Sequence, residues 1–312
     1  MSVVDRLLSP LVPLSFGAPG LRLRRRGFAP LPRLDGQHVV VTGANSGIGQ
    51  AATAQLAALG ARVTMVCRDA GRAATARAEI LAAAPAASLT IERCDLSSLA
   101  DIAALAARLR DQPIDTLIHN AGVLPSSRID TGDGLELTWA THVVGPHLLT
   151  RLLQPQLART RGRVILVSSG GMYLVPLVVP GTVPDPYDGV RAYAFTKRAQ
   201  VALAALWTEH APAGPCVVAM HPGWADTAAV QASLPRFRAI TRPLLRDAAG
   251  GADTIAWLAA TAPSALTAGA FYFDRAARAT HVLPWQHDAA EARAALWAWC
   301  TARTDPWMPG SR

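Results

Sequence analysis

The stretch HVVVTGANSGIG (His38–Gly49) joins a short apolar run to a glycine-rich turn. A short apolar run that ends at a glycine is typical of a strand buried on both faces of a parallel sheet. The glycines allow a tight turn and a close approach of the backbone to a ligand, and a helix is expected to follow from Ile48 to Leu59. This strand, turn and helix predict a phosphate site at the N-terminus of the helix.

Apolar runs and helical segments alternate along the rest of the chain. Further strands are expected at RVTMVC, SLTIERCD, DTLIHN, RVILVSS, CVVAMHP and AFYF. Helices are expected over residues 70–84, from the serines after the third strand to about residue 110, and over 134–158, 191–210 and 248–261. The alternation predicts an α/β fold with a Rossmann-like doubly wound parallel sheet, covered by helices on both faces. No linker or repeat divides it, so we expect a single domain.

The positive charge is concentrated in an N-terminal arm. The formal net charge is +8, and residues 1–33 hold six arginines and one aspartate. The remainder is only weakly basic, which argues against nucleic-acid binding. The arm, which is expected to begin with a short amphipathic helix, predicts either an ordered strap on the domain or a reversible contact with a membrane surface.

The cysteine pattern bears on the compartment and on metals. The four cysteines are scattered, without a CxxC pair or neighbouring histidines. This argues against a metal site and a disulfide scaffold, and fits a reducing cytoplasm. No apolar run is long enough to span a membrane.

Small and polar residues follow the next strands where a dinucleotide would lie. Arg68 ends the second strand, and a cation there suits the 2′-phosphate of NADP, whereas NAD would call for a carboxylate. Asp95 closes the third strand, where it would hold adenine or cap the following helix. We therefore predict NADP(H) as the cofactor, bound by Gly43, Asn45, Ser46, Gly47, Ile48, Gly49, Arg68, Asp95, Leu96, Asn120, Ala121 and Gly122.

A tyrosine and a lysine four residues apart indicate proton transfer. Tyr193 and Lys197 lie in an expected helix, so they share one face. A nearby cation is expected to lower the tyrosine pKa from about 10, as acid–base work at neutral pH requires. Ser168 and Ser169 end the fifth strand nearby, and a serine hydroxyl there would hold the substrate oxygen.

Lys197 is the only lysine among 30 basic residues. With four tyrosines in 312 residues, random placement would rarely put it four positions after one of them. Lysine is a compact point charge on a flexible stem, which arginine does not reproduce. The retention of this one lysine favours a catalytic role.

The motifs TGANSGIG, CDL, NAG, VSS, YAFTK and HPG occur in an order and spacing that resembles the short-chain dehydrogenase/reductase family. The resemblance covers residues 37 to about 275. It implies a single catalytic domain over 36–283, an N-terminal arm over 1–35 and a helical extension over 284–312. It also implies that Tyr193 is the acid and base, that Lys197 contacts the nicotinamide ribose, and that Ser169 orients the carbonyl. Residues bordering the nicotinamide would be Pro222, Gly223 and Thr227.

One position departs from the family pattern. His142 stands where the family has an asparagine thought to hold a water that links the lysine to solvent. An imidazole would replace that water link or use a different proton route. Alternatively, it would be a hydrogen-bonded residue of the helix with no role in proton transfer.

The substrate is expected to be lipophilic. The insert MYLVPLVVPGTVPDPYDG (172–189) would wall an apolar pocket, and residues 224–246, with Leu234, Phe237 and Ile240, would form a lid. We therefore expect a ketone, aldehyde or alcohol substrate. Two alternatives stay open: a nucleotide-sensing protein without catalysis, and a lipid enzyme attached to a membrane by its arm. An oligomer is compatible with either.

Overall fold

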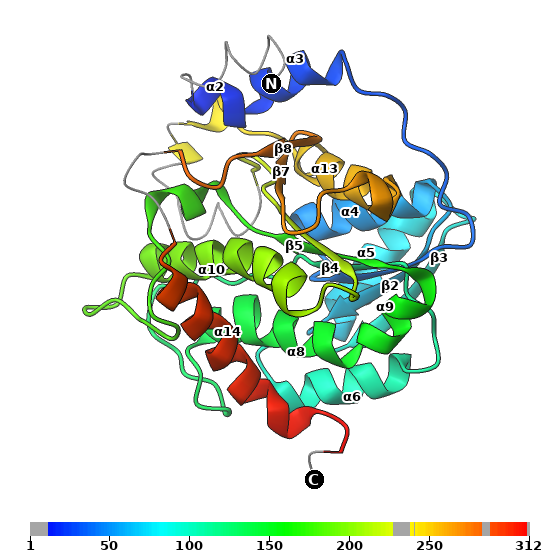
Figure 1. The fold of residues 1–312 in the computed structure, drawn as a ribbon. Helices are drawn as coiled ribbons and strands as arrows, with labels where there is room; N and C mark the ends of the chain where they lie inside the picture. Colours follow the sequence, from blue (N-terminus) through cyan, green and yellow to red (C-terminus); the bar gives the residue numbers. More distant parts are fainter. Residues whose placement is uncertain (1–11, 227–237, 240, 283–287, 311–312) are drawn as a thin grey trace.

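The structure is a computed structural model that describes residues 12–226, 238–239, 241–282 and 288–310 (Figure 1). Within these residues the sheet has eight strands in the order β3-β2-β1-β4-β5-β6-β7-β8. Neighbouring strands are parallel, except that β7 and β8 are antiparallel. The strands are β1 (His38–Thr42), β2 (Arg62–Cys67), β3 (Ser88–Arg93), β4 (Thr116–His119), β5 (Arg163–Val167), β6 (Cys216–Met220), β7 (Phe271–Phe273) and β8 (Ala276–Arg278).

Helices cover both faces of the sheet, as Figure 1 shows. One face carries α4 (Gly47–Ala58), α5 (Ala70–Ala83) and α13 (Ala248–Ala260), and the other carries α6 (Leu99–Leu109), α8 (Gly145–Leu152) and α10 (Gly189–His210). Helix α14 (Ala290–Thr304) packs on α10. Val39 and Val41 of β1 join the core beneath α4, whereas Val40 joins the core on the opposite face. The expected doubly wound α/β fold is confirmed.

The long helix expected around residues 134–158 is confirmed in part. It is helical without a gap from Leu137 to Leu152, through α7 (Leu137–Trp139), a π-helical turn (Ala140–Val144) and α8, and a break at Leu153 separates it from α9 (Gln154–Thr160). Pro146 is one cause of the π-helical turn, because it has no N–H to donate to the carbonyl of His142, four residues earlier. Pro155 starts the first turn of α9, where a missing N–H is tolerated. The other expected strands and helices are confirmed, apart from small shifts at their ends.

Several short elements were not expected. Strand β8 follows β7 through a tight turn in which Asp274 and Arg275 have φ of 48° and 58°, as a two-residue hairpin turn requires. Short 3₁₀ turns cover Gly170–Leu174, Arg242–Leu244, Pro263–Ala265 and Asp305–Trp307. The first of these is separated from β5 by two residues and lies at the functional site.

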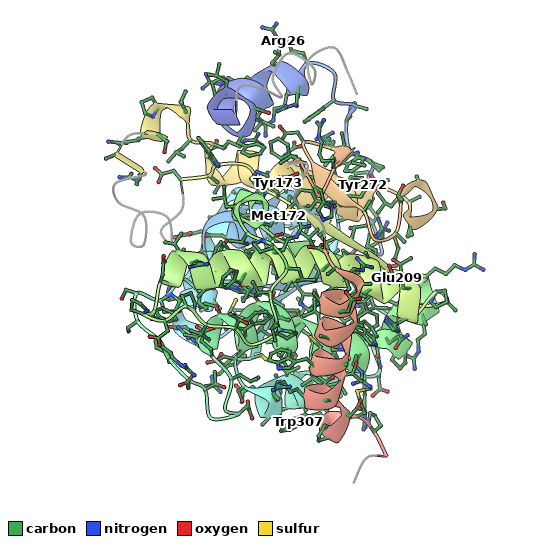
Figure 2. All side chains as sticks on the ribbon, turned by 60° about the vertical axis from the view of Figure 1, so that its left-hand side comes forward. Arg26, Met172, Tyr173, Glu209, Tyr272 and Trp307 are labelled. Carbon is green, nitrogen blue, oxygen red and sulfur yellow. The ribbon has the colours of Figure 1, made fainter. Side chains whose placement is uncertain are left out.

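The described part of the arm packs on the domain. Helices α2 (Val12–Phe16) and α3 (Ala18–Arg25) lie beside β7 and β8 at the top of Figure 1. Leu21 is buried, whereas Arg26 extends into solvent (Figure 2). This part of the arm is therefore a strap. The amphipathic helix expected within residues 1–11 lies outside the described residues, and the membrane contact stays a prediction. No described helix is both long and apolar enough to cross a membrane.

Candidate active site

A cavity of about 1180 Å³ is lined by residues that follow strands β1 to β6. The carboxyl ends of parallel strands are where doubly wound sheets hold their ligands. Most of the site residues expected from the sequence meet there. These are Gly43, Asn45, Ser46, Gly47, Ile48, Gly49, Arg68, Asp95, Leu96, Asn120, Ala121, Gly122, Ser169, Tyr193, Lys197, Pro222 and Gly223. His142 is fully buried beside the cavity, and Thr227 lies outside the described residues.

The glycine-rich turn needs its glycines. Gly43 has φ of +66°, and a Cβ there would lie 2.8 Å from the Cα of Ala121. A Cβ on Gly49 would lie 2.2 Å from the carbonyl oxygen of Gly43. Ser46 precedes α4 but makes no capping hydrogen bond in the described structure. The first N–H groups of α4 thus border the cavity without a side-chain cap, which fits a pyrophosphate.

Asn120 holds this turn in place. Its Nδ2 donates to the carbonyl oxygens of Thr42 (3.0 Å) and Gly43 (3.2 Å). The backbone N–H groups of Asn120 and Ala121 donate to the Thr42 hydroxyl at 3.0 and 3.1 Å. Hydrogen bonds therefore join the end of β4 to the turn after β1. The Asn120 side chain holds the backbone of that turn in position.

Two arginines, Arg68 after β2 and Arg72 in the first turn of α5, line the cavity. The guanidinium of Arg68 is mostly exposed and lies 3.9 Å from a carboxylate oxygen of Asp95. Arg72 was not expected at the site from the sequence. Asp69 accepts from its backbone N–H and so caps this first turn of α5. The capping role considered for Asp95 is wrong, because Ser98 caps α6. One oxygen of Asp95 instead accepts from the N–H and hydroxyl of Ser97 at 2.9 and 2.7 Å.

The two serines after β5 have different partners. Ser169 lines the cavity, and its hydrogen bond with Tyr193 favours the phenolate. Ser168 is buried and donates to the backbone carbonyl of Lys197 at 2.8 Å. Ser168 thus fixes α10 against β5, while Ser169 meets the tyrosine that α10 presents.

The pKa of Tyr193 departs from the expected direction. Burial raises this pKa to about 12, and the hydrogen bond with Ser169 only partly opposes the effect. Burial also lowers the pKa of Lys197 to about 7. The Lys197 Nζ lies 5.3 Å from the centre of the tyrosine ring. The expected lowering of the tyrosine pKa is therefore wrong for this structure, since desolvation favours the neutral form of both groups.

Lys197 is held by two oxygen acceptors. Its Nζ donates to the carbonyl of Val167 (2.8 Å) and to Oε1 of Gln200 (3.0 Å). Nε2 of Gln200 in turn donates to the carbonyl of His142 at 2.9 Å, the carbonyl to which Pro146, four residues later, has no N–H to donate. The contact of Gln200 with Lys197 was not expected from the sequence. Pro146 indicated that the carbonyl of His142 would lack its usual α-helical donor. Only the fold shows that Gln200 reaches this carbonyl.

The imidazole of His142 is a neutral link. The N–H of Val123 donates to its Nε2 at 2.9 Å, so the ring proton is on Nδ1. Nδ1 then donates to the hydroxyl of Thr196 (2.8 Å), which donates to the carbonyl of Tyr193 (2.9 Å). Burial holds the pKa of His142 well below 6.5. The ring thus joins the loop after β4 to the turn of α10 that carries Tyr193. The backbone carbonyl of His142 is linked to Lys197 through Gln200.

The insert over 172–189 contributes its first residues to the cavity. Tyr173 and Leu174 line it, whereas Leu177 packs into the core and Tyr187 donates to Glu136 at 3.1 Å. Of the expected lid, Trp224 lines the cavity. Its apolar residues Leu234, Phe237 and Ile240 lie outside the described residues.

Comparison with known proteins defines the class. The family model described as short chain dehydrogenase matches residues 37–236. The chain therefore belongs to the short-chain dehydrogenase/reductase family of oxidoreductases.

Within that family, the chain is 39% identical over 257 residues to dehydrogenase/reductase SDR family member 12 of Bos taurus, covering 80% of each protein. It is 38% identical over 249 residues to a candidate daunorubicin C-13 ketoreductase of Streptomyces sp. (strain C5), covering 78% of this chain and 84% of that protein. A crystal structure of an uncharacterised protein from Mycobacterium paratuberculosis superposes with a TM-score of 0.67 at 27% identity, covering 88% of this chain and 95% of that one.

Proposed function

We propose that the protein is an NADP(H)-dependent oxidoreductase that interconverts a carbonyl and an alcohol on a lipophilic substrate. The observation that carries the proposal is one cavity with a glycine turn and helix N-terminus at one end and Ser169, Tyr193 and Lys197 at the other. The first end suits a dinucleotide. The second combines a proton donor, a group to hold an oxygen and a cation.

The proton steps are assigned to this chain's own residues. The substrate oxygen would accept from the hydroxyls of Tyr193 and Ser169, and these two bonds would replace the hydrogen bond that joins the hydroxyls in the absence of substrate. Bound NADP(H) would supply or accept the hydride. In reduction Tyr193 gives its proton to the oxygen, and in oxidation its phenolate takes the proton back. Charged Lys197 stabilises the phenolate, and its bonds to Val167 and Gln200 hold it beneath the tyrosine ring.

Arg68 and Arg72 support the choice of NADP(H) over NAD(H). Both line the cavity beyond the end of β2, where a 2′-phosphate would lie. Replacing Arg68 by serine is expected to lower the preference for NADPH over NADH by about 10- to 100-fold, the size of a lost charge-assisted hydrogen bond. The ratio of kcat/KM with the two cofactors measures this preference. Arg93→Ser, at the exposed end of β3, is the control; an equal ratio in all three proteins would contradict the assignment.

An apolar rim supports a lipophilic substrate. Leu174 is 82% exposed, Val282 59% and Val190 46%, and all three line the cavity. Exposed aliphatic side chains around a cavity are typical of a site that admits an apolar ligand.

The test is direct. Protein mixed with NADPH and a panel of aliphatic, terpenoid, steroid and aromatic carbonyls is followed through NADPH consumption and alcohol formation. Turnover of at least one lipophilic carbonyl is expected. Tight NADPH binding without turnover of any member would favour the nucleotide-sensing alternative, and turnover of small polar sugars alone would contradict the lipophilic substrate.

The acceptors around Lys197 predict a pH dependence. As pH rises through about 7, Lys197 loses its proton, and carbonyl reduction is expected to fall because the phenolate loses its cation. In Gln200→Glu, a carboxylate beside Nζ favours the charged lysine, so the descending limb of the kcat/KM profile should move up by about one pH unit or more. Gln112→Glu, where Gln112 pairs with Arg62 away from the cavity, is the matched control. An unmoved limb in Gln200→Glu would exclude Lys197 as its cause.

A further inference from the structure

The N-terminal arm reaches the reacting end of the cavity. Phe16 lines the cavity together with Tyr193. A Cβ built on Gly170 would lie 3.6 Å from Cε2 of Phe16. Gly170 directly follows Ser169, so the arm puts an aromatic ring beside the serine that bonds the tyrosine.

Phe16 belongs to a cluster of rings, which we term the aromatic subsite. Tyr173 stacks on Phe16, and the other three rings meet it edge-on. The centroid distances from Phe16 are 6.5 Å to Tyr173, 4.7 Å to His221, 6.1 Å to Trp224 and 5.1 Å to Phe273. All four rings also line the cavity. Figure 2 shows Tyr173 between the arm and α10, the helix that carries Tyr193.

Two buried arginines fix Phe16 in this position. Nε of Arg246 donates to the carbonyl of Phe16 at 2.8 Å, and its guanidinium pairs with Asp274 at 2.6 Å. Arg24, on the arm, binds the same carboxylate at 2.9 Å. The N–H of Trp224 also donates to the carbonyl of Phe16, at 2.9 Å. Phe16 is thus held by groups from three segments distant in sequence, and it forms a fixed wall of the cavity.

Resting on the proposed function, we infer that the arm is part of the substrate site and that Phe16 is a specificity-determining residue. The aromatic subsite receives a flat, unsaturated, apolar ring system joined to the reacting carbonyl. Aromatic rings attract one another in offset or edge-to-face arrangements with centroids about 4.5–7 Å apart, the spacing that these side chains already keep with Phe16. A flexible alkyl chain gains no such contact and loses more rotational freedom on binding.

The test compares two methyl ketones of equal carbon count, 2-acetylnaphthalene and 2-dodecanone, in wild type and Phe16→Ala. For Phe16→Ala, kcat/KM on the flat ketone is expected to fall about tenfold, mainly through KM, with a change below about threefold on the alkyl ketone. Phe28→Ala is the matched control, since Phe28 lies on the same arm against Arg275 and away from the cavity. It should leave both ketones unchanged.

An equal fall for both ketones, or no fall for either, would overturn the inference. Phe16→Leu keeps an apolar side chain in the wall, so it replaces Phe16→Ala if that variant unfolds, and the same selective loss is expected. If the wild type reduces neither ketone, the proposed function is judged separately by the carbonyl panel, and binding of 2-acetylnaphthalene is measured by quenching of tryptophan fluorescence. Equal affinity of wild type and Phe16→Ala in that assay would then exclude the aromatic subsite.

Discussion

Replacing Tyr193 by phenylalanine is expected to lower kcat for carbonyl reduction about 10³-fold, in the middle of the range for loss of a general acid. The ring and its packing stay, and only the hydroxyl that meets Ser169 is removed. Because burial raises the pKa of Tyr193 to about 12, the wild-type phenol keeps its proton throughout the neutral range. NADPH affinity should change by less than about threefold, since the lost interaction serves the transition state.

Tyr187→Phe is the matched control. It also removes one phenolic hydroxyl, here the one that donates to Glu136 outside the cavity. Steady-state kinetics and NADPH fluorescence titrations on both variants measure the two effects. Turnover by Tyr193→Phe close to that of Tyr187→Phe would remove Tyr193 from the chemistry.

Replacing Asp274 by asparagine is expected to lower the free energy of unfolding by about 3–5 kcal/mol, the usual cost of breaking a buried ion pair from one side. The carboxylate lies between Arg24 and Arg246, and its side chain is 1% exposed. Asparagine removes the negative charge that these two buried guanidinium groups share. Urea denaturation followed by tryptophan fluorescence measures the loss.

The same substitution at Asp130 is the control, because Asp130 pairs with Arg128 and both side chains are more than half exposed. Exposed pairs contribute about 0–1 kcal/mol, so Asp130→Asn should be nearly neutral. Similar losses in the two variants would mean that the ion pair does not secure the arm. At temperatures where Asp274→Asn is folded, it should also show the reduced selectivity for flat ketones expected of Phe16→Ala.

Features that depend on local sequence could be predicted. The turn from Gly43 to Gly49 and the spacing of Tyr193 and Lys197 follow from backbone geometry that a few neighbouring residues determine. The ends of the strands could also be predicted, because buried parallel strands are short apolar runs. Most of the expected cofactor residues therefore line the same cavity.

Features that depend on burial or on distant partners could not be predicted. The pKa of Tyr193 rises because the fold desolvates it, and the motif alone contains no information on solvent access. Gln200 lies three residues after Lys197, and only the packing of α10 on the π-helical turn brings it to the carbonyl of His142. Nothing in the sequence distinguishes Arg24 from the exposed arginines of the arm. In the fold, its side chain is 93% buried against Asp274.

The arm also sets the order in which the active site can be completed during synthesis. Arg24 and Asp274 are 250 residues apart in the chain, so the ribosome releases the arm long before its anchor exists. At about 5–20 residues per second this interval lasts on the order of ten seconds or more. Until β7 and its turn have emerged, Phe16 lacks its contact with Phe273 and Arg24 lacks Asp274. The arm is thus the first wall of the cavity to be synthesised and one of the last to reach its final position.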